Sequence, residues 1–329
     1  MNKIYPDKLK IGDEIRVIAP SRSMAILSDE LKDIANKRFE ELGFKLTFGK
    51  NVIEKDDFAS SSIESRIEDL HDACRDVNVK AILTVIGGFN SNQLLKYLDW
   101  ELIKNNPKIF CGFSDITALN NSFFAKTGLV TYSGPHYSTF GQKLYFDYTL
   151  DYFKRCLMNN EPFTLESSDN WSEDSWYKDQ EDRKQIKNNG FFVINEGNAT
   201  GTILGGNLCT FNLLQGTEYM PTFEDNTVLF LEDDEETNPH NFDRDLQSLI
   251  HLPNFNKVKG IVIGRFQKVS DVTDELLTKI IKTKHELKNI PVIANVDFGH
   301  TDPKITFPVG GVTEIIVSTS TSKITISEH

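Results

Sequence analysis

The sequence has 329 residues, about twice the length of an average domain, so two domains are expected. It carries 36 Lys and Arg against 48 Asp and Glu, a formal net charge of −12, and 39% of its residues are hydrophobic. This composition is typical of a folded globular protein and excludes intrinsic disorder and collagen-like repeats. The acidic balance argues against nucleic acid as a partner, because contacts to phosphates need a basic face.

The cysteines and the N-terminal segment indicate a soluble, reduced, cytoplasmic protein. The four cysteines lie far apart and form no C-x-x-C pair, so neither a disulfide framework nor a zinc cluster is expected. The N-terminus lacks the apolar core of a signal peptide, and no stretch reaches the ~18 apolar residues of a membrane span. We therefore expect no membrane partner.

The first half of the chain alternates short apolar runs with amphipathic helical patterns. Strand–helix alternation of this kind predicts a parallel sheet with right-handed crossovers. We therefore expect an α/β fold whose N-terminal domain, residues 1–158, is Rossmann-like and carries the nucleophile. Strands are predicted at 14–20, 45–48, 81–86 and 108–113, and helices at 31–42, 63–77, 92–98, 116–126 and 145–158.

The composition changes after this domain. Residues 161–182 contain eight Asp or Glu and one Lys, with Trp171, Trp176 and Tyr177 among them. We interpret 159–189 as an acidic connection whose aromatic side chains either dock onto a domain or lie over an active site.

Residues 190–329 predict a second domain, which is mixed α/β and richer in strands. It is expected to carry the acid and the base of the site. Strands are predicted at 201–207, 227–231, 258–263, 291–297, 314–317 and 323–327, with a helix at 274–287 and a hairpin turn around 318–322.

The most informative short segment is Phe110-Cys-Gly-Phe-Ser-Asp-Ile116, where a strand ends and a helix begins directly after Ser114. A serine in such a turn exposes its hydroxyl beside the first helical N–H groups, which suit a developing oxyanion. The segment lacks the second glycine of a G-x-S-x-G motif, so Ser114 is either a nucleophile or a helix N-cap. Gly87-Gly88 forms a similar turn, which either supplies a second oxyanion donor or only reverses the chain.

A serine nucleophile needs a base, and seven histidines compete for that role. His300 is the first choice and His136 the second, because both lie in glycine-flanked loops directly after apolar strands. Glu232 is the candidate acid, since it is the first polar residue after the strand predicted at 227–231. The acidic run from Glu232 to Glu236 also reads as a solvated loop or a weak metal site. These residues favour a serine hydrolase, with a non-catalytic nucleotide or peptide binder and a metal-dependent hydrolase as alternatives.

Six segments carry a more specific signal because they occur together and in order. The sequence resembles the LD-carboxypeptidase family of serine peptidases, specifically its microcin C immunity branch, over nearly the whole chain. The segments that carry this resemblance are Gly87–Leu95, Gly112–Thr117, Gly205–Asn207, Leu231–Asp233, Gly264–Phe266 and Phe298–Pro303.

The resemblance implies a catalytic triad of Ser114, Glu232 and His300, with an oxyanion hole formed by the N–H groups of Gly88 and Asp115. It also implies a Rossmann-like domain and a β-rich domain with the site between them, a homodimer, and no metal or organic cofactor.

The family implies a small-molecule substrate of one of two kinds. Murein-recycling members remove the terminal D-alanine from muropeptides, whereas immunity members give antibiotic resistance by cleaving the amide between an aspartyl residue and a modified nucleotide. The Asn-Ser-Asn stretch after Gly88 and the tryptophan-bearing connection favour the immunity branch. In that branch Trp171 or Trp176 would stack on the nucleobase, and Asn207 would contact the substrate.

Overall fold

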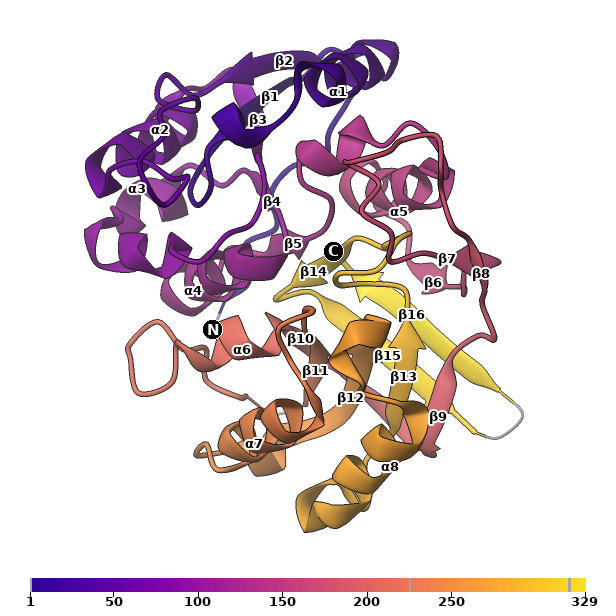
Figure 1. Cartoon of the computed structure of the whole chain (residues 1–329). Helices are drawn as coiled ribbons and strands as arrows, with labels where there is room; N and C mark the ends of the chain where they lie inside the picture. Colours follow the sequence, from indigo (N-terminus) through magenta and orange to yellow (C-terminus); the bar gives the residue numbers. More distant parts are fainter. Residues whose placement is uncertain (1, 225, 319–320) are drawn as a thin grey trace.

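The computed structural model describes residues 2–224, 226–318 and 321–329 of the chain. Within these residues two large sheets form two halves that lie one above the other, with the N-terminal half at the top of Figure 1. The upper half holds a predominantly parallel, Rossmann-like sheet, and the lower half holds a larger mixed sheet. The predicted α/β fold class is therefore confirmed.

The first sheet has six strands in the order β14-β5-β4-β3-β1-β2. Neighbouring strands are parallel except β14 and β5, which run antiparallel. Helices make the crossovers between the parallel strands, as the alternating pattern predicts. The strands are β1 (Glu14–Ile18), β2 (Lys45–Phe48), β3 (Val79–Thr84), β4 (Ile109–Cys111), β5 (Thr131–Ser133) and β14 (Phe307–Val309), and the helices are α1 (Asp29–Glu41), α2 (Ile63–Arg75), α3 (Trp100–Asn105) and α4 (Thr117–Thr127).

Two of these helices begin at serine caps. The Ser28 hydroxyl accepts a hydrogen bond from the Leu31 N–H at 3.2 Å, and the Ser62 hydroxyl accepts one from the Ser65 N–H at 3.0 Å. Each cap satisfies one of the backbone donors that a helix leaves free at its start. Helix α1 therefore begins two residues before its predicted start at Leu31, whereas α2 begins at Ile63, as predicted.

The second sheet has eight strands in the order β6-β16-β15-β10-β11-β12-β13-β9. Its central strands β10 to β13 are parallel, and the outer strands pair antiparallel. The strands are β6 (Phe163–Leu165), β9 (Phe192–Asn195), β10 (Gly197–Asn207), β11 (Thr227–Glu232), β12 (Val258–Gly264), β13 (Val292–Val296), β15 (Val312–Val317) and β16 (Ser322–Glu328), and the helices are α6 (Leu208–Asn212), α7 (Pro239–Ile250) and α8 (Asp274–Thr283).

The segment between the halves is more structured than a simple connection. Helix α5 (Asp147–Met158) precedes it, and strand β6 joins the second sheet by pairing with β16. Strands β7 (Asn170–Trp171) and β8 (Ile186–Lys187) pair with each other at the right of Figure 1. Conversely, β14 comes from the C-terminal part of the chain and completes the N-terminal sheet. We expected a domain at 1–158, a connection at 159–189 and a domain at 190–329. Strand β6 of the connection belongs to the second sheet, and β14 of the C-terminal segment belongs to the first.

Two local elements differ from the sequence prediction, and a third includes residues that the structure does not describe. The helix expected at 92–98 is a 3-10 helix over Ser91–Tyr97, and the helix expected at 274–287 ends at Thr283, with a 3-10 turn at His285–Leu287. Helical periodicity does not separate short 3-10 segments from α-helix. The hairpin turn expected at 318–322 includes residues 319 and 320, which lie outside the described residues.

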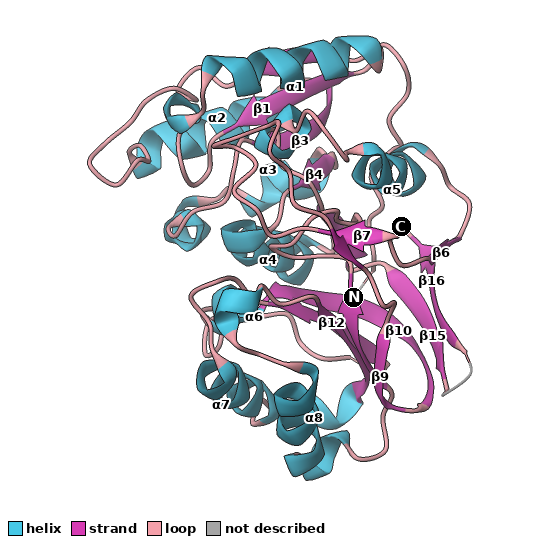
Figure 2. Ribbon diagram, turned by 45° about the vertical axis from the view of Figure 1, so that its right-hand side comes forward, coloured by secondary structure: helices cyan, strands magenta, loops and turns pink. Residues whose placement is uncertain are grey.

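Helix α4 lies between the two halves, as Figure 2 shows. It contacts β5 and β14 of the first sheet and β10 and α6 of the second. The Asn121 side chain on this helix donates to the Gly205 carbonyl at 2.8 Å and accepts from the Gly205 N–H at 3.1 Å. Because α4 starts three residues after Ser114, these contacts fix the Ser114 turn relative to the second sheet.

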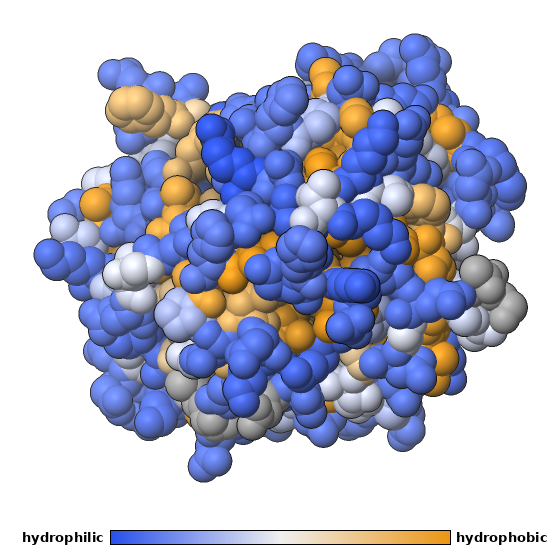
Figure 3. Space-filling view, turned by 90° about the horizontal axis from the view of Figure 1, so that it is seen from below, coloured by the Kyte–Doolittle hydropathy of each residue, from blue (hydrophilic) through white to orange (hydrophobic). Residues whose placement is uncertain are grey.

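The surface seen from below in Figure 3 is mostly hydrophilic, with apolar residues gathered in its middle. Across the described ranges, no helix has both the length and the apolar character that crossing a membrane requires.

Candidate active site

Ser114 lies in a strained turn after β4. Its φ of 61° is in the left-handed region, which a residue with a Cβ seldom adopts, and such strain is typical of a turn that presents a nucleophile. A short 3-10 helix begins at Ser114, but the N-cap residue is Phe113 and the Ser114 hydroxyl makes no cap. Instead, Ser114 Oγ lies 2.9 Å from His300 Nε2.

The other ring nitrogen of His300 faces Glu232. His300 Nδ1 lies 2.8 Å from Glu232 Oε2, and the Glu232 side chain is almost fully buried. Glu232 is the last residue of β11 rather than the first residue beyond it. Gly299 has a φ of 99°, and a Cβ there would lie 2.6 Å from Glu232 Oε2, so the close approach of this loop requires glycine. A hydroxyl, an imidazole and a carboxylate in this order define the site of the serine-hydrolase class.

The Glu232 carboxylate controls the charge of the imidazole. Burial alone would lower the pKa of His300, but the charge of Glu232 and its hydrogen bond outweigh burial, so the pKa lies above its ordinary 6.5. The neighbouring Asp233 behaves differently, because burial and the charges of Glu232 and Asp234 raise its pKa to about 7. Asp233 is therefore only partly ionised at neutral pH, which limits its repulsion of Glu232.

The two turns named for the oxyanion hole lie beside Ser114. A Cβ on Gly87 would come within 3.1 Å of Ser114 Oγ, so the Gly87-Gly88 turn lies directly against the serine. Asp115 anchors this arrangement through its carboxylate, which accepts hydrogen bonds from the Ser21 hydroxyl at 2.5 Å and the Ser91 N–H at 2.9 Å. Among the described residues, the Gly88 N–H donates no backbone hydrogen bond.

Ser114 and His300 open into a pocket of about 330 Å³ between the two halves. Its wall combines the Gly87-Gly88 turn with residues of the acidic connection, including Trp176 and Tyr177. Trp176 is half-buried, so one part of its indole is available to a ligand.

Two of the predicted substrate contacts lie elsewhere. Trp171 is 9% exposed and outside this pocket, where Arg265 and Lys268 lie 5.1 and 5.5 Å from its ring centroid. Asn207 is buried and caps α6 by accepting from the Thr210 N–H, and its amide donates to Asp233. Docking of the connection thus explains Trp171, and helix capping explains Asn207, so neither contacts the pocket directly.

His136, the second choice for the base, also lines the pocket but does not contact Ser114. Its Nδ1 lies 2.7 Å from Thr84 Oγ1, and its ring stacks on Phe113 with centroids 4.4 Å apart. Burial, followed by the charges of Lys304 and His300, holds the pKa of His136 well below 6.5. This imidazole is therefore neutral.

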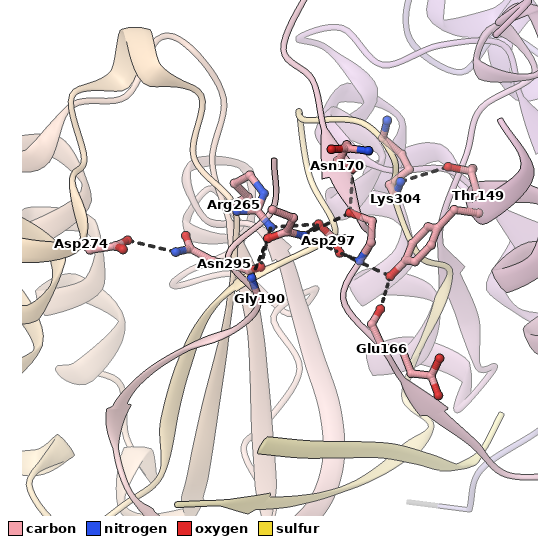
Figure 4. A network of polar contacts seen from close by, with 12 residues as sticks. Thr149, Glu166, Asn170, Gly190, Arg265, Asp274, Asn295, Asp297 and Lys304 are labelled. Atoms are coloured by element: carbon pink, nitrogen blue, oxygen red, sulfur yellow. Dashed lines mark hydrogen bonds and ion pairs between the residues drawn. The ribbon is translucent and has the colours of Figure 1, made fainter. Parts of the chain in front are cut away.

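A buried polar network supports the loop that carries His300, and Figure 4 shows it. Asp297, three residues before His300, accepts from Arg265 Nη2 at 3.0 Å and from the Ser168 N–H at 2.7 Å. Tyr148 and Asn188 donate to the same carboxylate. The network therefore joins β12, the end of β13 and both ends of the acidic connection.

Sequence reasoning did not select Arg22 and Lys304, which also line the pocket. Arg22 follows β1 at the same edge of the sheet as Gly88 and Ser114, so the strand-end rule could have identified it. Lys304 forms an ion pair with Asp302 in the loop after His300, and only the fold reveals that its side chain faces the pocket. Among the described residues, no group of three His, Cys, Asp or Glu side chains is placed to hold a metal ion.

Comparison with known proteins identifies the family of the chain. The chain matches models of the LD-carboxypeptidase N-terminal domain over residues 15–134 and the LD-carboxypeptidase C-terminal domain over residues 200–315. YocD of Bacillus subtilis (strain 168) is 56% identical over 99% of this chain and 100% of its own length. The chain belongs to the LD-carboxypeptidase family and is a serine-type carboxypeptidase or hydrolase.

Relatives of two kinds are found within the family. The microcin C7 self-immunity protein MccF of Escherichia coli is 30% identical over 98% of this chain and 95% of its own. A Bacillus subtilis protein named for murein peptide carboxypeptidase activity is also 30% identical, over 93% of this chain and 89% of its own.

Solved structures extend these comparisons. An MccF-like protein from Bacillus anthracis str. Ames superposes with a TM-score of 0.97 at 56% identity, covering 99% of this chain and 100% of that one. MccF in complex with aspartyl sulfamoyl adenosine superposes with a TM-score of 0.89 at 30% identity, covering 99% of both chains. The resemblance to the microcin C immunity branch is thereby confirmed.

Proposed function

We propose that the protein is a serine amidase that hydrolyses the amide bond of a peptidyl- or aminoacyl-nucleotide of the microcin C type. The observation that carries this proposal is the chain of contacts from Ser114 through His300 to Glu232, which opens into a pocket lined by Trp176. The family membership supports the peptidase chemistry. The ligand of MccF, an aspartyl sulfamoyl adenosine, supports the nucleotide-bearing substrate.

In the proposed acylation step, Ser114 Oγ attacks the amide carbonyl carbon while His300 Nε2 takes the hydroxyl proton. The carbonyl oxygen becomes an oxyanion, which the N–H groups of Gly88 and Asp115 stabilise. Each such donor contributes roughly 10²–10³-fold in rate. His300 then gives its proton to the departing nitrogen, the C–N bond breaks, and an acyl-serine ester remains.

Deacylation repeats these roles with water as the nucleophile. His300 takes a proton from water, the hydroxide attacks the ester, and Ser114 leaves with the proton that His300 returns. Glu232 orients and stabilises the imidazolium that forms in each half of the reaction.

A murein LD-carboxypeptidase is the competing function, and the similarity to the murein peptide carboxypeptidase favours it. The test is a side-by-side hydrolysis assay of aspartyl sulfamoyl adenosine and a murein tetrapeptide, with Ser114→Ala as the blank. We expect a higher kcat/KM for the adenosine compound. Faster release of D-alanine would show that the muropeptide is the substrate. If neither compound is hydrolysed, both candidate functions are contradicted.

Trp176 provides a test of nucleobase binding. Trp176→Leu is expected to lower kcat/KM for aspartyl sulfamoyl adenosine by ~10-fold, mainly through KM, because stacking on an aromatic ring contributes about 1–3 kcal/mol per base. Trp171→Leu is the matched control, since Trp171 lies outside the pocket. An unchanged KM in the Trp176 variant, or an equal rise in both variants, would show that Trp176 does not bind the base.

The pH dependence tests the coupling between His300 and Glu232. His300 must be neutral to accept the serine proton, and its pKa lies above 6.5. We therefore expect kcat/KM to fall as the pH decreases through an apparent pKa above 6.5. In Glu232→Gln burial would dominate, so the pKa of His300, followed by NMR in a Ser114→Ala background, should drop below 6.5. A wild-type acid limb below 6.5 would contradict the coupling.

The cytoplasmic location and the homodimer stay predictions. Light scattering coupled to size-exclusion chromatography would measure the oligomeric state directly.

A further inference from the structure

Arg22 is a cation on the pocket wall whose side chain has no acidic partner among the described residues. Its guanidinium carbon lies 4.6 Å from the centroid of the Phe89 ring, an arrangement that holds the side chain in place by a cation–π contact. Its Nε is buried without a hydrogen-bond acceptor. The side chain as a whole is half-buried, and the described residues give its guanidinium no hydrogen-bond acceptor, so its other N–H groups can bind an anion in the pocket.

The rest of the pocket does not attract anions. Its other cation, Lys304, is already paired with Asp302. Of the acidic residues on the wall, Glu173, Asp174 and Asp302 are paired with Lys268, Arg183 and Lys304. The described residues give Asp234, Glu235 and Glu236 no cationic partner, so carboxylates without counter-ions predominate. An anionic substrate group can therefore bind favourably at Arg22 and is repelled along most of the remaining wall.

Arg22 also lies beside the turn proposed to hold the oxyanion. Its backbone N–H donates to the Gly87 carbonyl at 3.3 Å, and a Cβ on Gly88 would lie 3.0 Å from Arg22 Cγ. The Ser21 hydroxyl ties the same segment to Asp115. The Arg22 side chain therefore extends from a segment that lies directly against the Gly87-Gly88 turn beside Ser114.

We propose that Arg22 binds the anionic group that the substrate carries two or three bonds beyond the scissile nitrogen. This inference rests on the proposed function, since it places the scissile amide at Ser114. An acyl phosphoramidate or sulfamate of a nucleotide has its charge on atoms attached to the phosphorus or sulfur next to that nitrogen. A C-terminal amino acid has its carboxylate at nearly the same distance. The planar fork of arginine matches both kinds of anion.

Paired substrates test this role. Aspartyl sulfamoyl adenosine is compared with the aspartyl amide of 5′-amino-5′-deoxyadenosine, which keeps the amide but lacks the anionic linker. A murein tetrapeptide is compared with its C-terminal carboxamide. In Arg22→Gln we expect kcat/KM to fall ~10–100-fold for the anionic member of the preferred pair and by less than about threefold for the neutral member. Arg22→Lys should lie between wild type and Arg22→Gln, because it keeps the charge without the fork.

Lys279→Gln, an exposed cation on α8, controls for the loss of one positive charge and should match wild type. Binding of AMP to Ser114→Ala, with and without Arg22→Gln, gives a readout that is independent of turnover. Equal losses for both members of a pair, or unchanged AMP affinity, would overturn the role of Arg22. If the wild type cleaves no substrate, the proposed function fails, while the AMP measurement still decides whether Arg22 binds anions.

Discussion

Ser114→Ala is expected to lower kcat by at least ~10⁴-fold on the preferred substrate while leaving the fold intact. The substitution removes the nucleophile, and in triad enzymes this loss leaves only the residual rate that the oxyanion hole and substrate binding provide. Alanine keeps a Cβ, so the strained φ of 61° and the midpoint of thermal unfolding should hardly change. Steady-state kinetics and thermal unfolding measure the two effects separately.

Ser138→Ala is the matched control for this prediction. Ser138 also lines the pocket and is buried, but its hydroxyl does not contact His300. Like Ser114→Ala, the control removes one serine hydroxyl from the pocket. We expect the kcat of Ser138→Ala to stay within about threefold of wild type. If Ser114→Ala retained more than about one hundredth of the wild-type kcat, Ser114 would not be the nucleophile.

Asp297→Ala is expected to lower the free energy of unfolding by about 3–5 kcal/mol. Asp297 is fully buried and neutralises Arg265, whose side chain is 7% exposed. Removing the carboxylate leaves a buried guanidinium without its counter-ion and deprives the Ser168 N–H of its acceptor. Urea denaturation followed by circular dichroism would measure the change.

Glu275→Ala provides the comparison for an exposed ion pair. Glu275 pairs with Lys279 at 2.9 Å on the surface of α8, where solvent screens the pair, so we expect hardly any change in the free energy of unfolding. A cost below ~1 kcal/mol for Asp297→Ala would show that the network of Figure 4 is not structurally important. Because Asp297 lies three residues before His300, the variant should also lose activity below its unfolding temperature.

The strand-end rule located the proposed triad from the sequence. Glu232 and His300 lie at or beyond the carboxyl ends of β11 and β13, which share one edge of the second sheet. Ser114 follows β4 of the first sheet, and packing of the two sheets brings that edge against it. The structure places the functional atoms of the three residues within hydrogen-bonding distance of one another. The same rule cannot distinguish His300 from His136, because it gives no information on which side chain faces the serine.

Features that depend on long-range contacts could not be read from local patterns. Trp171 and Trp176 are five residues apart in one acidic segment, and only the packing against Arg265 and Lys268 separates their roles. Asn207 reads as a polar residue at a strand end, yet it serves as a helix cap. Strands β6 and β14 are three residues long, too short for period-2 alternation to identify their sheets.

The pairing of β14 with β5 has a consequence for how the enzyme is made. During synthesis the N-terminal sheet emerges first, but its edge at β5 stays open until residues 307–309 leave the ribosome. An open edge is a site for wrong pairing, so the nascent chain depends on residues 307–309 to protect its first sheet. His300 precedes β14 by only a few residues. Pairing of β14 with β5 therefore also limits how far the His300 imidazole can lie from Ser114. The proposed site at Ser114 can therefore form only after residues 300–309 have been synthesised.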